Sequence, residues 1–117
     1  MRVKICGITR PEDARFAEHA GANAIGVILF SDSKRCVSPV RAVEIFTAVG
    51  PFTTTVAVTH TKSRKELDQI IALKPDAIQI SHPFVFSKDP DARVIRVIGR
   101  GSPLTQDCDA VIVDESH

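Results

Sequence analysis

Tryptophan and tyrosine are absent from this sequence of 117 residues, so phenylalanine, aliphatic and arginine side chains would have to hold any aromatic ligand. No apolar run approaches the roughly 18 residues that a membrane-spanning helix needs. Neither sign of charge is in marked excess, because 15 basic and 14 acidic residues give a net charge of only +1. This balance gives no indication of a nucleic-acid or membrane partner, and we expect neither.

Cysteine is scarce as well. The three cysteines are Cys6, Cys36 and Cys108, and no two of them have CxxC spacing. An odd number without that spacing argues against a disulfide framework and against a zinc site. His60 and His82 have no partner at metal-ligand spacing and are interpreted as polar loop residues. We therefore expect no metal site.

A separate charged and apolar leader is missing too, because strand-like residues start at Val3. We expect no signal peptide and a cytoplasmic location. Hydrophobic residues make up 44% of the sequence and charged residues 25%, which is usual for globular proteins. The length is sufficient for a hydrophobic core, and residues 1–117 are predicted to form a single domain.

Strand-like and helix-like segments alternate along the whole chain. A continuous apolar run such as Ala24–Phe30 is typical of a strand buried on both faces. The segment Pro11–Ala20 has alanines at helical spacing and is followed by Gly21. The six predicted strands are Val3–Ile8, Ala24–Phe30, Thr53–Thr59, Ala77–Ser81, Val94–Ile98 and Ala110–Asp114.

Helix-start signals occur at three places. Thr9 and Glu12 have the spacing of a capping box, with a proline between them in the first turn. Ser38 is predicted to cap a second helix, which a Gly-Pro pair ends at 50–51. Ser63 and Glu66 form another capping box, for a helix that runs to about residue 74.

Three connecting segments lack helical periodicity. Ser31–Val37 is polar and basic and is predicted to be a loop. Residues 82–92 contain two prolines, so a fourth helix is expected to be short or absent. Residues 99–109 are again weak for helix, because Gly101 and Pro103 interrupt them.

Parallel strands joined by helical crossovers predict an α/β protein, built either as a doubly wound sheet or as part of a closed barrel. The strand–helix repeat is regular, and no glycine-rich phosphate loop follows the first strand. Both features favour the barrel. The predicted fold is an incomplete (β/α)8 TIM barrel with a parallel sheet, made of about the first six β/α units.

Cys6 is the first candidate for chemistry, because it stands near the end of the first strand and Gly7 follows it. The ordinary role of a cysteine in a strand is that of a small buried hydrophobe. However, Gly7 allows a substrate to approach the backbone closely, and Lys4 lies two residues back on the same strand face. A cation there would favour the thiolate, which accepts a proton.

Other polar residues lie at or near strand ends. Asp114 ends an apolar run and either faces the catalytic end of the barrel or caps a following helix. Arg35 lies in a basic loop, where it is either solvated or binds a carboxylate. Gln79 and Arg96 lie inside strands, where an unpaired amide or charge is costly. Gln79 is expected to bond to its neighbours or to a ligand, and Arg96 to a carboxylate such as that of Asp114.

The first strand and the turn after it read Val3-Lys4-Ile5-Cys6-Gly7-Ile8-Thr9, followed by Pro11-Glu12-Asp13-Ala14. Further along the chain come Ser33-Lys34-Arg35 with Ser38-Pro39, then Ala77-Ile78-Gln79-Ile80, then Val111-Ile112-Val113-Asp114. In this order the motifs closely resemble those of the phosphoribosylanthranilate isomerases of tryptophan biosynthesis. The resemblance implies an eightfold β/α barrel, of which this chain supplies the first six strands.

The resemblance also implies a reaction, the Amadori rearrangement of N-(5'-phosphoribosyl)anthranilate to 1-(2-carboxyphenylamino)-1-deoxyribulose 5-phosphate without cofactor or metal. It makes Cys6 the general base that removes the C2' proton and Asp114 the general acid that protonates the ring oxygen. Arg35 is then the residue that binds the anthranilate carboxylate. The predicted substrate-binding residues are Arg35, Gln79, Gly7 and Arg96.

The chain departs from the usual family pattern in three places. Ser81-His82 follows the fourth strand where the family has His-Gly, Arg96 replaces a lysine, and Glu115 replaces a threonine. These changes concern the shape of the pocket. They leave open a related isomerase that acts on a different phosphosugar.

The family's phosphate-binding loops follow the seventh and eighth strands, which this sequence does not contain. Binding of a remote phosphate holds such substrates in reactive geometry. We therefore expect very weak or no isomerase activity from the 117-residue chain alone. Unpaired strand edges predict dimerisation or aggregation. A non-enzymatic partial barrel, completed by a partner or by a second copy, is the other alternative.

Overall fold

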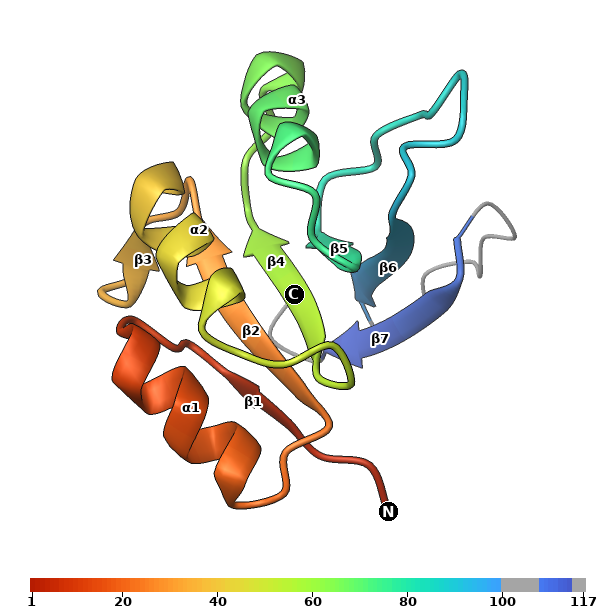
Figure 1. The fold of residues 1–117 in the computed structure, drawn as a ribbon. Helices are drawn as coiled ribbons and strands as arrows, with labels where there is room; N and C mark the ends of the chain where they lie inside the picture. Colours follow the sequence, from red (N-terminus) through yellow and green to blue (C-terminus); the bar gives the residue numbers. More distant parts are fainter. Residues whose placement is uncertain (100–107, 115–117) are drawn as a thin grey trace.

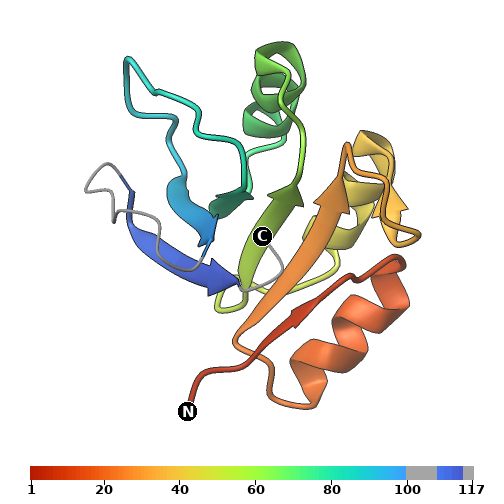
Figure 2. The ribbon, with the colours of Figure 1, turned by 180° about the vertical axis from the view of Figure 1, so that it is seen from behind.

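The computed structural model describes residues 1–99 and 108–114, which form one parallel sheet with helices between its strands (Figure 1). The main strand order is β1-β2-β4-β5-β6-β7, and the short β3 pairs with β2 beside this path. Figure 2 shows the same order from behind, from the red β1 to the blue β7. The strands are β1 Lys4–Cys6, β2 Ala24–Leu29, β3 Cys36–Val37, β4 Thr54–Thr59, β5 Ala77–Ile80, β6 Arg93–Gly99 and β7 Ala110–Asp114.

All six predicted strands are present, with ends that differ by at most two residues. The strand β3 was not expected, because the sequence predicted a loop over Ser31–Val37. It forms because β1 ends opposite Gly26. The last residues of β2 therefore have no strand beside them on that edge until β3 pairs with them. Ile28 and Leu29 of β2 pair there with Cys36 and Val37.

Three helices connect the first strands: α1 Pro11–His19, α2 Pro39–Thr47 and α3 Arg64–Ala72. The capping box predicted for α1 is wrong, because Arg10 is the N-cap and makes no side-chain capping bond. The cause is Pro11, which occupies the first helical position and holds the preceding residue extended, at φ −138° and ψ 145°. Thr9 therefore lies one position too early to cap the helix.

The other two helix starts were predicted correctly. The Ser38 hydroxyl accepts the Arg41 N–H at 3.2 Å, and the Ser63 hydroxyl accepts the Glu66 N–H at 3.3 Å. The Glu66 carboxylate does not complete a box, however, because it accepts a hydrogen bond of 2.5 Å from the Thr61 hydroxyl. No helix forms over residues 81–92, as expected. The weak helix expected over 99–109 falls mostly on residues outside the described part of the chain.

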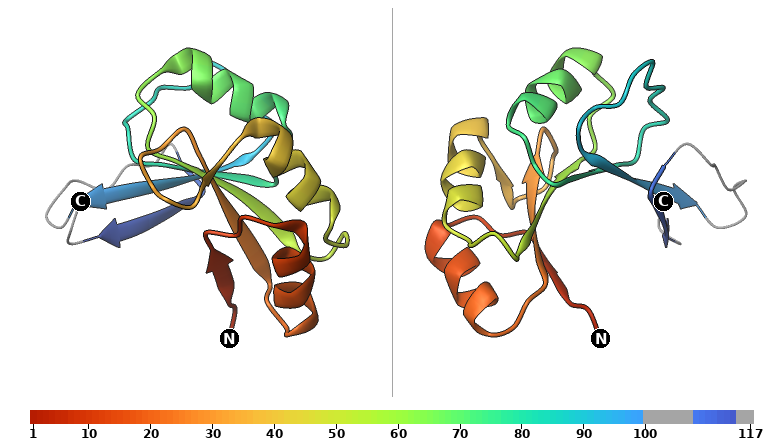
Figure 3. Two further views of the ribbon diagram at one scale, coloured as in Figure 1. Left: turned by 90° about the vertical axis from the view of Figure 1, so that its left-hand side faces the viewer. Right: turned by 45° about the vertical axis from the view of Figure 1, so that its right-hand side comes forward.

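The three helices cover one face of the sheet, as the two views of Figure 3 show. The main hydrophobic core lies between them and the sheet, and its fully buried members include Ile25, Ile45, Leu67 and Ile78. A second, smaller cluster lies on the other, concave face. It contains Val56, Val58 and Ala77, with Ala24, Ile28 and Ile95 packed against it.

Alternation along each strand separates the two clusters. Ile78 and Ile80 of β5 belong to the core under the helices, whereas Ala77 belongs to the concave cluster. The sheet therefore curves around its own apolar interior, and the six parallel strands form a half-barrel. In parallel α/β sheets, functional groups gather where the strands end. We call this edge of the half-barrel, at the C-terminal ends of its strands, the mouth.

Candidate active site

Cys6 is the last residue of β1 and is exposed at the mouth. Its sulfur lies on the concave face, because a Cβ added at Gly26 would stand only 3.1 Å from Cys6 Sγ. The backbone after Cys6 is fixed, since the N–H groups of Gly7 and Ile8 both donate to the Gly26 carbonyl, at 3.0 and 3.1 Å. Gly26 thus provides both the space for the sulfur and the acceptor that ends the strand.

Arg35, in the loop after β2, folds over Gly7, the residue that follows Cys6 at the end of β1. Gly7 has φ +84°, a conformation that side chains rarely adopt. A Cβ at this position would stand 2.7 Å from Arg35 Cδ and 2.8 Å from Arg35 Nη1. The turn therefore favours glycine at position 7, and a side chain there would displace Arg35.

Gln79 of β5 also lies on the concave face, where it contacts β1. Its Oε1 accepts a hydrogen bond of 2.5 Å from Lys4 Nζ, across the interior of the half-barrel. Lys4 and Cys6 lie two residues apart and share a strand face. The structure therefore brings together Cys6, Gly7 and Arg35 at the mouth, with Lys4 and Gln79 on the same concave face.

Asp114 ends β7, and its backbone pairs with Gly99 at the end of β6. The same register pairs Ala110 with Ile95, a residue of the concave cluster. The strand β7 therefore ends at the mouth, on the same sheet as Cys6. The Asp114 side chain lies outside the described part of the chain.

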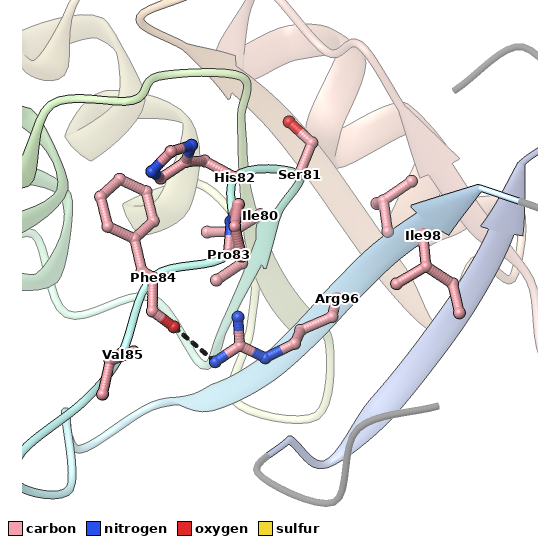
Figure 4. A pocket seen from close by; sticks show the side chains of 9 residues that line it. Ile80, Ser81, His82, Pro83, Phe84, Val85, Arg96 and Ile98 are labelled. Carbon is pink, nitrogen blue, oxygen red and sulfur yellow. Dashed lines mark hydrogen bonds between the residues drawn. The ribbon is translucent and has the colours of Figure 1, made fainter. Parts of the chain in front are cut away.

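Arg96 is not brought together with these residues. Its neighbour Val94, two positions earlier, belongs to the core on the helical face, and Arg96 lies on that face as well. Only 6% of Arg96 is exposed, and its Nη2 donates a hydrogen bond of 2.7 Å to the Phe84 carbonyl (Figure 4). The Phe86 ring lies 5.9 Å from its guanidinium carbon. A carboxylate from Asp114 was expected, and that side chain is not among those described.

A cavity of about 280 Å³ adjoins Arg96, between the ends of β5 and β6 and the segment after β5. Figure 4 shows its lining, which includes Ser81, His82 and Ile98. His82 packs edge-on against the Phe84 ring, with ring centroids 4.7 Å apart. The segment after β5 forms no helix, and its Phe84 carbonyl and Phe86 ring contact Arg96.

Sequence reasoning missed one pair of polar residues near the mouth. Ser31 follows β2, His60 follows β4, and Ser31 Oγ lies 2.7 Å from His60 Nδ1. His60 had been interpreted as an ordinary loop residue. The two residues are 29 positions apart, and no local pattern predicts such a contact.

A search of the described residues finds no group of three His, Cys, Asp or Glu side chains that could hold a metal ion. Over the same residues, none of the helices is both long and apolar enough to cross a membrane.

Residues 3–88 match the family model described as N-(5'-phosphoribosyl)anthranilate (PRA) isomerase. The chain belongs to the PRA isomerase family. The match includes the strand with Cys6, the loop with Arg35 and the strand with Gln79. The resemblance of the sequence motifs is thus confirmed.

Individual PRA isomerases agree with this assignment. The protein from Methanoregula boonei is 64% identical over 99% of this chain, and the one from Stutzerimonas stutzeri is 49% identical over 64% of it. The crystal structure of the Thermus thermophilus enzyme superimposes on the whole chain with a TM-score of 0.79 and 30% identity. A PRA isomerase in complex with reduced 1-(o-carboxyphenylamino)-1-deoxyribulose 5-phosphate superimposes on 85% of the chain, with a TM-score of 0.72 and 33% identity.

The chain is shorter than these PRA isomerases. It spans 60% of the Methanoregula boonei protein and 64% of the Thermus thermophilus chain. The half-barrel is accordingly a partial TIM barrel of the PRA isomerase type, as the sequence predicted.

Proposed function

We propose that this chain carries the acid–base half of a PRA isomerase active site and takes part in the Amadori rearrangement of N-(5'-phosphoribosyl)anthranilate in tryptophan biosynthesis. The observation that supports this most strongly is the position of Arg35 over Gly7, the residue directly after Cys6. In this proposal a proton acceptor and a carboxylate-binding group serve the same end of the half-barrel, as a substrate with a reacting sugar and a benzoate requires.

The proposed chemistry uses two groups. Asp114 protonates the furanose ring oxygen while the bond from that oxygen to C1' breaks, and the anthranilate nitrogen supplies the electron pair that forms the C1'–N double bond. Cys6, as thiolate, removes the proton from C2', and the electrons of that C–H bond form the enamine. Tautomerisation of the enamine gives the ketose. A base and an acid on separate strands suit such a two-step proton transfer.

Arg35 binds the anthranilate carboxylate in this proposal, because a guanidinium offers paired donors to it. Gln79 contributes an amide on the concave face, and Gly7 leaves the space that both Arg35 and the substrate occupy. Arg96, predicted to join this set, is assigned a supporting role, since it holds the segment after β5 through the Phe84 carbonyl.

Genetic complementation tests the proposed function. A tryptophan-requiring strain that lacks PRA isomerase receives this chain, or an extended chain in which residues 1–117 are continued by the C-terminal part of the Methanoregula boonei relative. We expect growth with the extended chain, little or none with residues 1–117 alone, and none with extended Cys6→Ala or Asp114→Asn. Extended Cys108→Ala serves as the matched control and is expected to grow. Growth with extended Cys6→Ala would contradict the proposed base.

The sheet edges provide a proposed mode of self-association. Among the described strands, β1 pairs only with β2, and β7 pairs only with β6. In and beside β1, the residues Val3, Ile5 and Phe16 are 40%, 41% and 76% exposed. Such an edge favours association between copies of the chain. Light scattering of residues 1–117 is expected to give a dimer or larger species, and a monodisperse monomer at high concentration would contradict this.

A further inference from the structure

The loop that carries Arg35 has a defined shape. It begins at Phe30, whose φ of +50° turns the chain sharply after β2, and it ends where β3 pairs back onto β2. Inside the loop, the Cys36 N–H donates to the Ser33 carbonyl at 3.1 Å. Both ends of the loop are therefore fixed to the sheet. The orientation of Arg35 depends on the residues between them.

Two serine hydroxyls organise this interval. Ser31 Oγ accepts the N–H of Ser33 at 3.2 Å, and Ser33 Oγ accepts the N–H of Arg35 at 3.2 Å. Each hydroxyl thus binds the backbone two residues later, a local bond that serines form in turns. Together they form a continuous series of contacts from Ser31 to the backbone of Arg35.

His60 connects this series to the neighbouring strand. Its Nδ1 lies 2.7 Å from Ser31 Oγ, and either tautomer permits the bond, with the ring or the hydroxyl as donor. The end of β4 is itself fixed, because Thr59 Oγ1 donates to the Phe30 carbonyl at 3.5 Å and accepts the Thr61 N–H at 3.2 Å. His60 directly follows this fixed end of β4, so its ring holds Ser31 in place.

We propose that His60 is a positioning residue for Arg35, acting through Ser31 and Ser33. This inference rests on the proposed function, in which Arg35 binds the carboxylate of the substrate. The guanidinium crosses Gly7 next to Cys6, so a small shift of the loop moves the carboxylate-binding group relative to the base. His60 is exposed and makes this contact at the mouth, so its loss alters the loop more than the core.

Kinetics of the extended chain test this inference with two substrates, N-(5'-phosphoribosyl)anthranilate and its aniline analogue without the carboxylate. We expect His60→Ala to raise KM for the anthranilate substrate about five- to tenfold, as the loss of one or two hydrogen bonds implies, with kcat changed less. The KM for the aniline analogue is expected to stay unchanged. An equal rise in KM for both substrates would contradict a role of His60 through Arg35.

Two variants sharpen this comparison. His60→Asn places an amide group near the position of Nδ1 and is expected to restore most of the affinity. His19→Ala removes an exposed histidine from the last turn of α1 and is expected to have no effect. If His60→Asn fails to restore the affinity for the anthranilate substrate and His19→Ala also weakens it, the effect is a general one of histidine removal. That result would overturn the proposal.

A measurement on residues 1–117 is independent of isomerase activity. The heteronuclear NOE and chemical shift of the Arg35 Nε–Hε group report how rigidly the guanidinium is held. We expect both to change in His60→Ala and in Ser31→Ala, and to stay unchanged in His19→Ala. Unchanged Arg35 signals in His60→Ala would overturn the inference. Changed signals together with an inactive extended chain would support His60 as a positioning residue and reject the isomerase proposal alone.

Discussion

The ammonium group of Lys4 on β1 donates a hydrogen bond of 2.5 Å to Oε1 of Gln79 on β5. In the sheet, β2 and β4 separate these two strands, so the bond spans the interior of the half-barrel. An ammonium group only donates, and it therefore fixes the amide oxygen of Gln79 toward itself. The amide nitrogen then points away from the ammonium group, and we propose that its N–H groups donate to an oxygen of the substrate.

Removing the ammonium group tests this relationship. Lys4→Met leaves the part-buried Gln79 oxygen without its donor, so we expect a loss of about 1–2 kcal/mol in the free energy of unfolding. Gln79→Met should cost a similar amount, and the double variant less than the sum, as urea titrations would show. Lys62→Met on the exposed surface is the control. Additive losses in the double variant would show that the bond contributes nothing.

Two glycines with positive φ offer a matched pair at the site. Gly7 and Gly21 have φ +84° and +103°, but a Cβ would clash with Arg35 only at Gly7, because nothing lies within 4 Å at Gly21. Each change to alanine should cost about 1–2 kcal/mol of stability from backbone strain. Only Gly7→Ala should also shift the Arg35 Nε–Hε signal. A shift of equal size in Gly21→Ala would mean that Arg35 does not lie on Gly7.

Glu18 on α1 predicts a pH dependence of stability. The Thr53 hydroxyl and the Gly50 N–H both donate to its Oε2, the latter at 2.8 Å, and these bonds hold the pKa of Glu18 below its ordinary value. The unfolded chain therefore binds this proton more readily. The contribution is complete above the ordinary pKa and is lost as the pH falls through the lowered one.

Urea titrations at neutral pH and at about pH 3, chosen to lie below the ordinary glutamate pKa, measure this contribution. We expect Glu18→Gln to destabilise the chain at neutral pH and the difference from the natural sequence to shrink in acid. Glu44→Gln, at an exposed position on α2, should show little difference at either pH. A constant Glu18→Gln effect across this range would contradict the assigned bonds.

The helix caps give a direct comparison between a correct and an incorrect prediction. Ser38→Ala removes the hydroxyl that accepts the Arg41 N–H and should cost about 1 kcal/mol. Thr9→Ala should cost much less, because Arg10 is the N-cap of α1. Thermal or urea unfolding of the two variants would decide this, and equal losses would restore Thr9 as a capping residue.

Local patterns were sufficient to predict most of the fold. The strand β2 was apparent as a continuous apolar run, and α2 from Ser38 followed by a proline, because burial and capping act within a few residues. Thr9 was placed wrongly since two signals competed there. The fixed backbone before Pro11 took precedence over the capping-box spacing.

Local sequence patterns could not predict the contacts between segments that are far apart in the chain. The bond between Ser31 and His60, and the strand β3, depend on where β1 ends beside β2 and on how the loops fold over the mouth. Arg96 shows the same limit. Its strand was predicted, whereas its hydrogen bond to the Phe84 carbonyl depends on how the helix-free segment after β5 folds.

Turnover of N-(5'-phosphoribosyl)anthranilate by the extended chain, with Cys6→Ala compared with Cys108→Ala, is the most direct measurement. If the sulfur of Cys6 is the base, its removal lowers kcat by about 100-fold or more, as loss of a general base does, and removal of Cys108 leaves kcat nearly unchanged. A Cys6→Ala enzyme within a few-fold of the unsubstituted one would show that another group takes the C2' proton.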